Sequence, residues 1–132
     1  MSMSNRKIDM NSNVCDVKKT EILEPSVKAK IMDFFVNCRC DEIWVSSMPI
    51  VDCFTDQPVN RYIMAGRPVS HVFFYKTPYV WTSEDVYHFD KYDVQLYPDF
   101  KEYAINYSKQ SNEEGMSLIE LFEKLAKERK AN

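Results

Sequence analysis

Residues 69–76 constrain the fold of this chain more than any other segment. Side chains alternate between the two faces of a strand, and in this segment both faces are largely apolar. The two sets are Val69, His71, Phe73 and Tyr75 on one face, and Ser70, Val72, Phe74 and Lys76 on the other. A strand with one face in water alternates cleanly between apolar and polar residues. The pattern therefore predicts a central strand that is covered on both faces, by helices or by a second layer.

A hairpin is predicted just before this strand. Residues 59–65 are a second strand candidate, and Gly66, Arg67 and Pro68 separate the two segments. Glycine tolerates a positive φ, and proline cannot donate a hydrogen bond to a strand ladder. Because the chain has only two glycines, Gly66 indicates a backbone requirement at this junction. We therefore expect residues 59–65 to pair with residues 69–76.

Three segments show the periodicity of an amphipathic helix. The first begins at Pro25, which suits a first helical turn, and ends within residues 37–41. The second follows Pro98, and the third begins near Ser117, which forms a capping-box pattern with Glu120. The apolar positions are Val27, Ile31, Phe34 and Cys38 in the first helix, Phe100, Tyr103, Ala104 and Tyr107 in the second, and Leu118, Leu121, Phe122 and Leu125 in the third.

Shorter segments rich in β-formers complete the pattern. Residues 43–48 and 50–54 are separated by Pro49, and residues 79–81 and 93–97 are two further strand candidates. Residues 82–89 fit either a capped helix start or a strand, and residues 14–24 fit either a short edge strand or a helical turn.

These elements predict a single α+β domain over residues 14–132, preceded by a disordered tail over residues 1–13. We expect an antiparallel or mixed sheet of about five strands, flanked by an N-terminal helix and two C-terminal helices. The apolar stripe of the last helix is wide, which favours packing across the sheet over projection towards a partner.

Composition excludes several classes of protein. With 132 residues, of which 45% are hydrophobic, the chain can bury a core and is too apolar to be disordered. Its apolar runs are too short to cross a bilayer, and its first residues lack the apolar region of a secretory signal. We therefore expect a cytoplasmic protein without membrane contact. The net charge of -3 is mild and mixed, so no nucleic acid is expected as a partner.

The four cysteines are expected to be free thiols in a reducing compartment. The alternative is a zinc site built from Cys38, Cys40 and Cys53, with Cys15 or a histidine. Structural zinc sites usually pair their ligands as C-x2-4-C, whereas this chain has one C-x-C and widely spaced single cysteines. The spacing therefore predicts no metal, and no other cofactor is indicated.

An enzyme hypothesis depends on the two histidines, His71 and His88, because histidine is the usual proton carrier near neutral pH. If their segments pair, both rings would face one cleft and support acid-base hydrolysis of a phosphodiester, with Arg61 or Arg67 stabilising negative charge. Histidines on such strand faces are more often hydrogen-bonded core or rim residues. The chain also lacks a G-x-S-x-G elbow and glycine-rich phosphate loops. A metal-independent hydrolase or nuclease is therefore the alternative function.

Binding to another protein is the favoured function. The chain has eight tyrosines and two tryptophans, and these residues, like arginine, are enriched among interface anchors. The candidate binding residues are Arg61, Tyr62, Arg67, Tyr75 and Trp81. An aromatic core would explain the same rings, and an aromatic pocket for a small ligand or nucleotide is a further alternative.

The composition also suggests a biological role. Small, glycine-poor and aromatic-rich chains without motifs are often accessory proteins of phages or other mobile elements, which block a host enzyme or defence system. We therefore expect an accessory or inhibitor protein that acts by protein-protein contact. The sequence does not indicate an oligomeric state.

Overall fold

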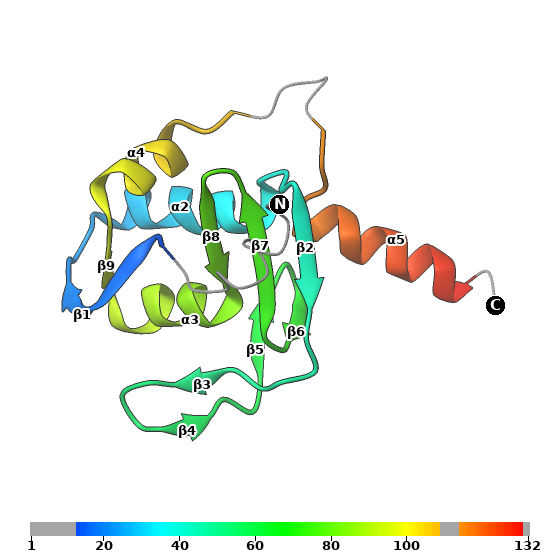
Figure 1. Cartoon of the computed structure of the whole chain (residues 1–132), viewed down its shortest axis with the longest axis horizontal. Helices are drawn as coiled ribbons and strands as arrows, with labels where there is room; N and C mark the ends of the chain where they lie inside the picture. The colour runs from blue at the N-terminus through cyan, green and yellow to red at the C-terminus, as the bar shows by residue number, and fades with distance from the viewer. Residues whose placement is uncertain (1–12, 109–113, 131–132) are drawn as a thin grey trace, which may run out of the picture.

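A three-stranded antiparallel sheet lies at the centre of the protein (Figure 1). The structure is a computed structural model that describes residues 13–108 and 114–130. The strands follow the order β2 (Glu42–Val45), β7 (Val72–Lys76) and β8 (Tyr79–Thr82). Strand β7 is therefore central, as predicted, and β2 lies at an edge.

Helices close one face of this sheet around an aromatic core. Helix α2 (Pro25–Asn37) lies behind the sheet, α4 (Pro98–Asn106) packs on α2, and α3 (Ser83–Tyr92) follows β8 (Figure 1). The large side chains that these elements bury completely or almost completely are aromatic: Phe34, Phe35, Phe74, Trp81, Phe89 and Phe100. Much of the aromatic content of the sequence therefore serves the core.

The remaining strands form three small antiparallel pairs around the central sheet. The pairs are β1 (Cys15–Thr20) with β9 (Val94–Leu96), β3 (Val51–Asp52) with β4 (Gln57–Pro58), and β5 (Tyr62–Met64) with β6 (Arg67–Val69). The α+β class is confirmed. The strands are divided among several small sheets, where the sequence suggested one sheet of about five strands.

The predicted hairpin is present but is shorter than expected, because β5 pairs with β6 and not with residues 72–76. Ala65 and Gly66 form its turn with positive φ angles of 52° and 79°. The chain then breaks at Ser70, whose hydroxyl donates to the carbonyl of Ser46 at 2.6 Å and whose carbonyl accepts from the Ser83 hydroxyl at 2.7 Å. These side-chain bonds replace strand pairing, so residues 69–76 do not form one continuous strand.

Residues 83–92, whose first part the sequence left open, form helix α3. A capping box fixes its start: the Asp85 amide donates to Thr82 Oγ1 at 3.1 Å, and the Thr82 amide donates to Asp85 Oδ2 at 2.8 Å. Because the capping box satisfies two of the free amides at this end, it favours the helix over the strand that Val86, Tyr87 and Phe89 would otherwise form.

Helix α5 (Leu118–Lys130) forms as predicted, with reciprocal capping bonds between Ser117 and Glu120. It does not pack across the sheet, which corrects the packing that the sequence favoured. Its first turn is fixed by buried Leu118 and by the ion pair of Arg39 with Glu120 at 2.9 Å. Leu121 and Phe122 also pack against the core, and beyond them the helix projects away from the rest of the protein (Figure 1).

Several sequence expectations concern residues that the structure does not describe. Residues 1–12 of the expected tail and residues 109–113 of the segment before α5 lie outside the described ranges. Within residues 13–108 and 114–130, none of the helices has both the length and the apolarity that crossing a bilayer requires.

The attachment of α5 to the domain depends on a close backbone approach at Gly115. Met116 and Cys40 exchange backbone hydrogen bonds of 3.0 and 3.1 Å. A β-carbon on Gly115 would lie 2.2 Å from the Cys40 carbonyl oxygen, and the φ of Gly115 is +96°. Only glycine fits this position without displacing backbone.

We expect Gly115→Ala to destabilise the protein more than Gly66→Ala. At Gly66 the φ is also positive, but nothing lies within 4 Å of an added β-carbon. Gly66→Ala should therefore carry only the cost of a left-handed residue, about 1–2 kcal/mol, whereas Gly115→Ala adds the overlap with Cys40. Urea unfolding followed by circular dichroism measures both changes, and equal losses would contradict the close approach.

Candidate functional site

The side of the central sheet opposite the helices carries a row of partly exposed rings. Trp44 lies opposite Phe73 in the register of β2 and β7, so the two side chains share a face. Tyr75 follows Phe73 by two residues on the same face, and the ring of His71 packs on Phe73 at a centroid distance of 4.8 Å. We call Trp44, His71, Phe73 and Tyr75 the outer face.

Burial differs sharply between the two sides of this sheet. On the core side Phe74 and Trp81 are completely buried. On the outer face Trp44 is 44% exposed, and His71, Phe73 and Tyr75 are half-buried. The sequence predicted that β7 would be covered on both faces. Its outer face is only partly covered, because the helices pack on the core side of the sheet (Figure 1). On the neighbouring strand β8, Val80 and Thr82 lie on the same side as the outer face and are buried.

Two polar features belong to the outer face. The indole Nε1 of Trp44 donates to Glu42 Oε1 at 2.7 Å, which holds the exposed ring in one orientation. The Nε2 atom of His71 is buried and has no hydrogen-bond partner among the residues described. An unpaired buried nitrogen costs free energy, so a partner that brings a hydrogen-bonding group here would recover it.

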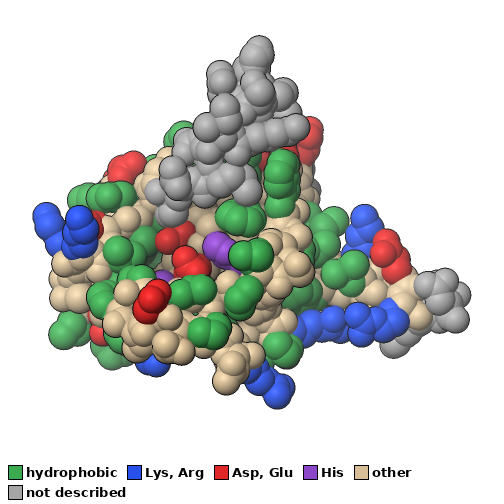
Figure 2. Space-filling view, turned by 60° about the horizontal axis from the view of Figure 1, so that its bottom comes forward, with side chains coloured by type: hydrophobic (Ala, Val, Ile, Leu, Met, Phe, Trp, Pro, Cys, Tyr) green, Lys and Arg blue, Asp and Glu red, His purple; other side chains and the backbone are tan. Residues whose placement is uncertain are grey.

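A second cluster fixes the β3–β4 hairpin to helix α3. Asp52 Oδ2 accepts from the Tyr87 hydroxyl at 2.6 Å and from the Tyr92 hydroxyl at 2.5 Å. Asp52 Oδ1 accepts from the backbone amides of Phe54 and Thr55 at 2.8 and 3.2 Å. Figure 2 shows hydrophobic side chains gathered around histidine and acidic side chains on this side of the molecule.

The hydrogen bonds of this cluster shift the pKa values of its members. Burial by itself raises the pKa of Asp52, but the four hydrogen bonds outweigh burial and hold that pKa well below its ordinary value. The hydrogen bond to Asp52, with burial, raises the pKa of Tyr92 to about 12. Burial and the bond to Asp52 also raise the pKa of Tyr87. The cluster is therefore one carboxylate held by two neutral phenols.

His88 belongs to the same attachment. Its Nε2 accepts from the Cys53 amide at 2.9 Å, so its Nδ1 carries the proton and donates to the Glu84 carbonyl at 2.7 Å. The ring packs against Phe54 and Tyr92. Both nitrogens of His88 thus serve backbone groups, and its ring contacts differ from those of His71. Because both nitrogens are engaged, neither is open in this structure to act with His71 as a proton-carrying pair.

The predicted binding residues lie in three different places. Tyr75 is on the outer face. Trp81 is completely buried, so we correct its assignment: its ring is a core residue that no partner reaches. Tyr62 donates to Asp90 Oδ2 at 3.0 Å and packs edge-on against Tyr87, which attaches the β5–β6 hairpin to α3.

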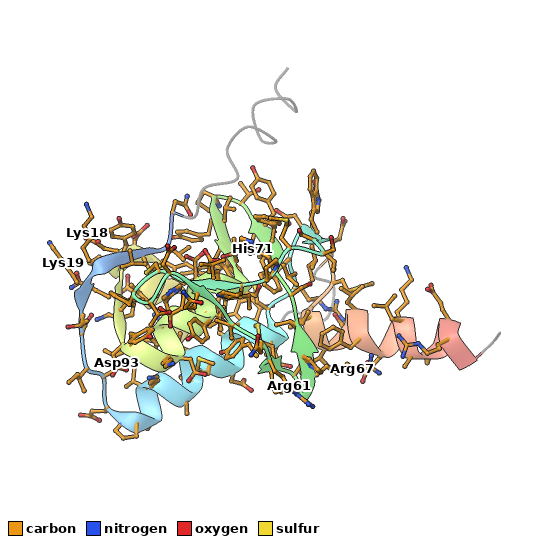
Figure 3. All side chains as sticks on the ribbon, turned by 90° about the horizontal axis from the view of Figure 1, so that it is seen from below. Lys18, Lys19, Arg61, Arg67, His71 and Asp93 are labelled. Atoms are coloured by element: carbon orange, nitrogen blue, oxygen red, sulfur yellow. The ribbon has the colours of Figure 1, made fainter. Side chains whose placement is uncertain are left out.

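The two predicted arginines lie at the β5–β6 hairpin, well away from His71 (Figure 3). Arg61 is exposed. The guanidinium of Arg67 lies over the Phe122 ring of α5 at 5.5 Å from its centroid. Arg67 therefore links the hairpin to α5, and neither arginine belongs to the outer face.

The cysteines are all free thiols. Cys38 and Cys40 are buried, Cys15 is half-buried and Cys53 is exposed. Within the described ranges, no three side chains among His, Cys, Asp and Glu gather closely enough to hold a metal ion.

Sequence reasoning missed Trp44 and Asp52 as site residues. Trp44 stands in a short β-rich segment, where alternation alone does not tell which side chains face solvent. Asp52 precedes a turn, and an aspartate that accepts amides two and three residues ahead is a common turn signal. Its two tyrosine partners come from a helix that folding brings close.

We expect Asp52→Asn to remove an acid-sensitive part of the stability. Because the folded pKa of Asp52 is depressed, its contribution is present above the unfolded value of about 3.9 and is lost as the pH falls through the folded pKa. The variant should be less stable than wild type at pH 7, and the difference should shrink below about pH 4. Thermal unfolding from pH 2 to 7 measures it.

Asp56→Asn is the matched control, since Asp56 is an exposed carboxylate of the same turn and asparagine also tolerates its φ of 60°. This control should follow the wild-type pH profile. If Asp52→Asn also followed that profile, the carboxylate would not hold the hairpin.

Comparison with known proteins gives no relative for this fold or site. No protein-family model, curated protein or solved structure matches the chain significantly.

Proposed function

We propose that this protein binds another protein through the outer face and acts as an accessory or inhibitor protein. The observation that carries the proposal is the row of partly exposed rings on a sheet whose other side is a closed core. Tryptophan and tyrosine on a rigid strand present large contact areas and lose little conformational entropy on binding. Trp44 is the proposed anchor.

The shape of the surface favours a protein over a small ligand. The rings of the outer face come from neighbouring strands and lie side by side on the sheet. A shallow depression exists elsewhere, on α4, but it contains no aromatic ring; its lining residues are Pro98, Lys101, Glu102, Ile105 and Asn106.

Two observations fit the wider role. Both nitrogens of His88 hold backbone groups, which leaves the hydrolase alternative without its second proton carrier. The four thiols are unpaired, which fits a reducing compartment such as the cytoplasm. Both features fit a cytoplasmic protein that blocks a host enzyme by contact, as phage-encoded accessory proteins do, and that catalyses no reaction of its own.

The test is partner capture with matched surface variants. Tagged wild-type protein is used as bait in lysate of its natural host cell, and each captured protein is purified and titrated against the variants. Trp44→Ala and Tyr75→Ala should each weaken binding by roughly tenfold or more, which corresponds to about 1.4 kcal/mol.

Two control variants locate the surface. Ile22→Ala changes a side chain that is 85% exposed in the segment between β1 and α2, and it should leave affinity unchanged. Arg61→Ala tests the β5–β6 hairpin that the sequence suggested. If Arg61→Ala weakened the complex and Trp44→Ala did not, the partner would bind the hairpin and the outer face would be rejected.

A further inference from the structure

We propose that the open edge of β2 pairs with β2 of a second copy of this chain. The two strands would run antiparallel about a twofold axis at Trp44, and two three-stranded sheets would become one continuous sheet. This inference concerns the edge of the sheet and does not depend on the function proposed for its outer face.

The backbone of β2 shows which groups are open. The Ser46 amide donates to the His71 carbonyl at 3.0 Å, so Ser46 points its hydrogen-bonding groups towards β7. The direction of the backbone amide and carbonyl alternates along an antiparallel strand. The amide and carbonyl of Trp44 therefore also face β7, while those of Ile43 and Val45 face the open edge. Across the part of the chain that the structure describes, no strand pairs with this side of β2. The open amides and carbonyls of Ile43 and Val45 are therefore placed to pair with another extended strand.

The edge carries little of the usual protection against pairing. Natural edge strands are kept short or are blunted by charged side chains, above all lysine, and by proline. Strand β2 is short, but Glu42 is its one charged residue, and neither lysine nor proline occurs in Glu42–Val45. Two of its large apolar side chains are exposed to solvent: Trp44 is 44% exposed and Val45 is 64% exposed. Among the residues described, Met116 pairs with Cys40, just before the start of this edge.

The strand is complementary to itself in one register. When Ile43 lies opposite Val45 of the second copy, both open residues of each strand use their amides and carbonyls. The two Trp44 residues then face each other across the axis as an aromatic pair. Glu42 lies opposite Ser46 in this register, so no like charges oppose.

The direction of α5 favours a second copy over an unrelated strand. This helix projects past the side of the molecule that carries β2 (Figures 1 and 3), and its Leu125 is 40% exposed. Residues 123–130 contain four lysines and arginines against two glutamates, in a chain whose net charge is -3. A second copy therefore offers an acidic body to each basic helix end.

The first test is the mass of the untagged protein in solution. Sedimentation equilibrium over a concentration series should show a particle of twice the chain mass of 15.6 kDa. Val45→Pro removes the open amide without touching the bonds to β7, and it should give the monomer with an unchanged circular dichroism spectrum. A wild-type protein that stays monomeric at every concentration overturns the proposal.

Cross-linking tests the register. In a Cys53→Ser background, which removes the exposed thiol, Trp44→Cys places two cysteines across the axis at about 4.5 Å between α-carbons, within disulfide reach. Mild oxidation should give a linked dimer on a non-reducing gel. Val45→Cys is the control, since Val45 is more exposed but lies opposite Ile43. Equal cross-linking of both variants indicates random collision and rejects the pairing. Neither test uses a partner protein, so their failure is distinct from failure of the proposed function.

Discussion

The structure depends on the burial of one indole ring. Trp81 is completely buried, and its ring lies 5.4 to 6.0 Å from the rings of Phe34, Phe35, Phe74 and Phe100. These partners come from β7, α2 and α4, so a single side chain of β8 joins the sheet to two helices. Its Nε1 is buried without a hydrogen-bond partner in the residues described, and the apolar contact of the ring must therefore exceed the cost of that unpaired nitrogen.

Helix α3 contributes to this core and also holds the β3–β4 hairpin on the surface. Helix α3 contributes Phe89 to the core and presents Tyr87, His88 and Tyr92 to the β3–β4 hairpin. The β3–β4 pair is only two residues long on each strand, and such short pairs are not stable alone. Asp52 accepts from two backbone amides of its own hairpin, and His88 of α3 accepts from the Cys53 amide. These hydrogen bonds take the place of the missing strand contacts. The hydrogen bonds hold the pKa of Asp52 below its ordinary value, so this attachment contributes an acid-sensitive part of the stability.

Unequal cover on the two sides of the central sheet produces the surface that we connect with function. The helices fill the core side, while the rings of the outer face stay partly exposed and β2 has an open edge among the residues described. Trp44 belongs to both regions, because its ring lies on the outer face while its neighbours Ile43 and Val45 direct their backbone to the edge. A dimer through this edge would place two outer faces side by side, and a partner protein could then contact both.

The local elements of this protein follow from signals in its sequence. Helices α2, α4 and α5 follow from apolar spacing and from Pro25, Pro98 and the Ser117 capping box, because these signals act within one or two turns. Which rings face solvent depends on contacts between distant segments. Trp81 and Trp44 both stand in short strands, yet Trp81 belongs to the core and Trp44 to the surface. The division of strands into small sheets, the Asp52 cluster and the projection of α5 likewise depend on contacts between distant segments. Local periodicity carries no information about which segments meet, so these features could not be read from the chain.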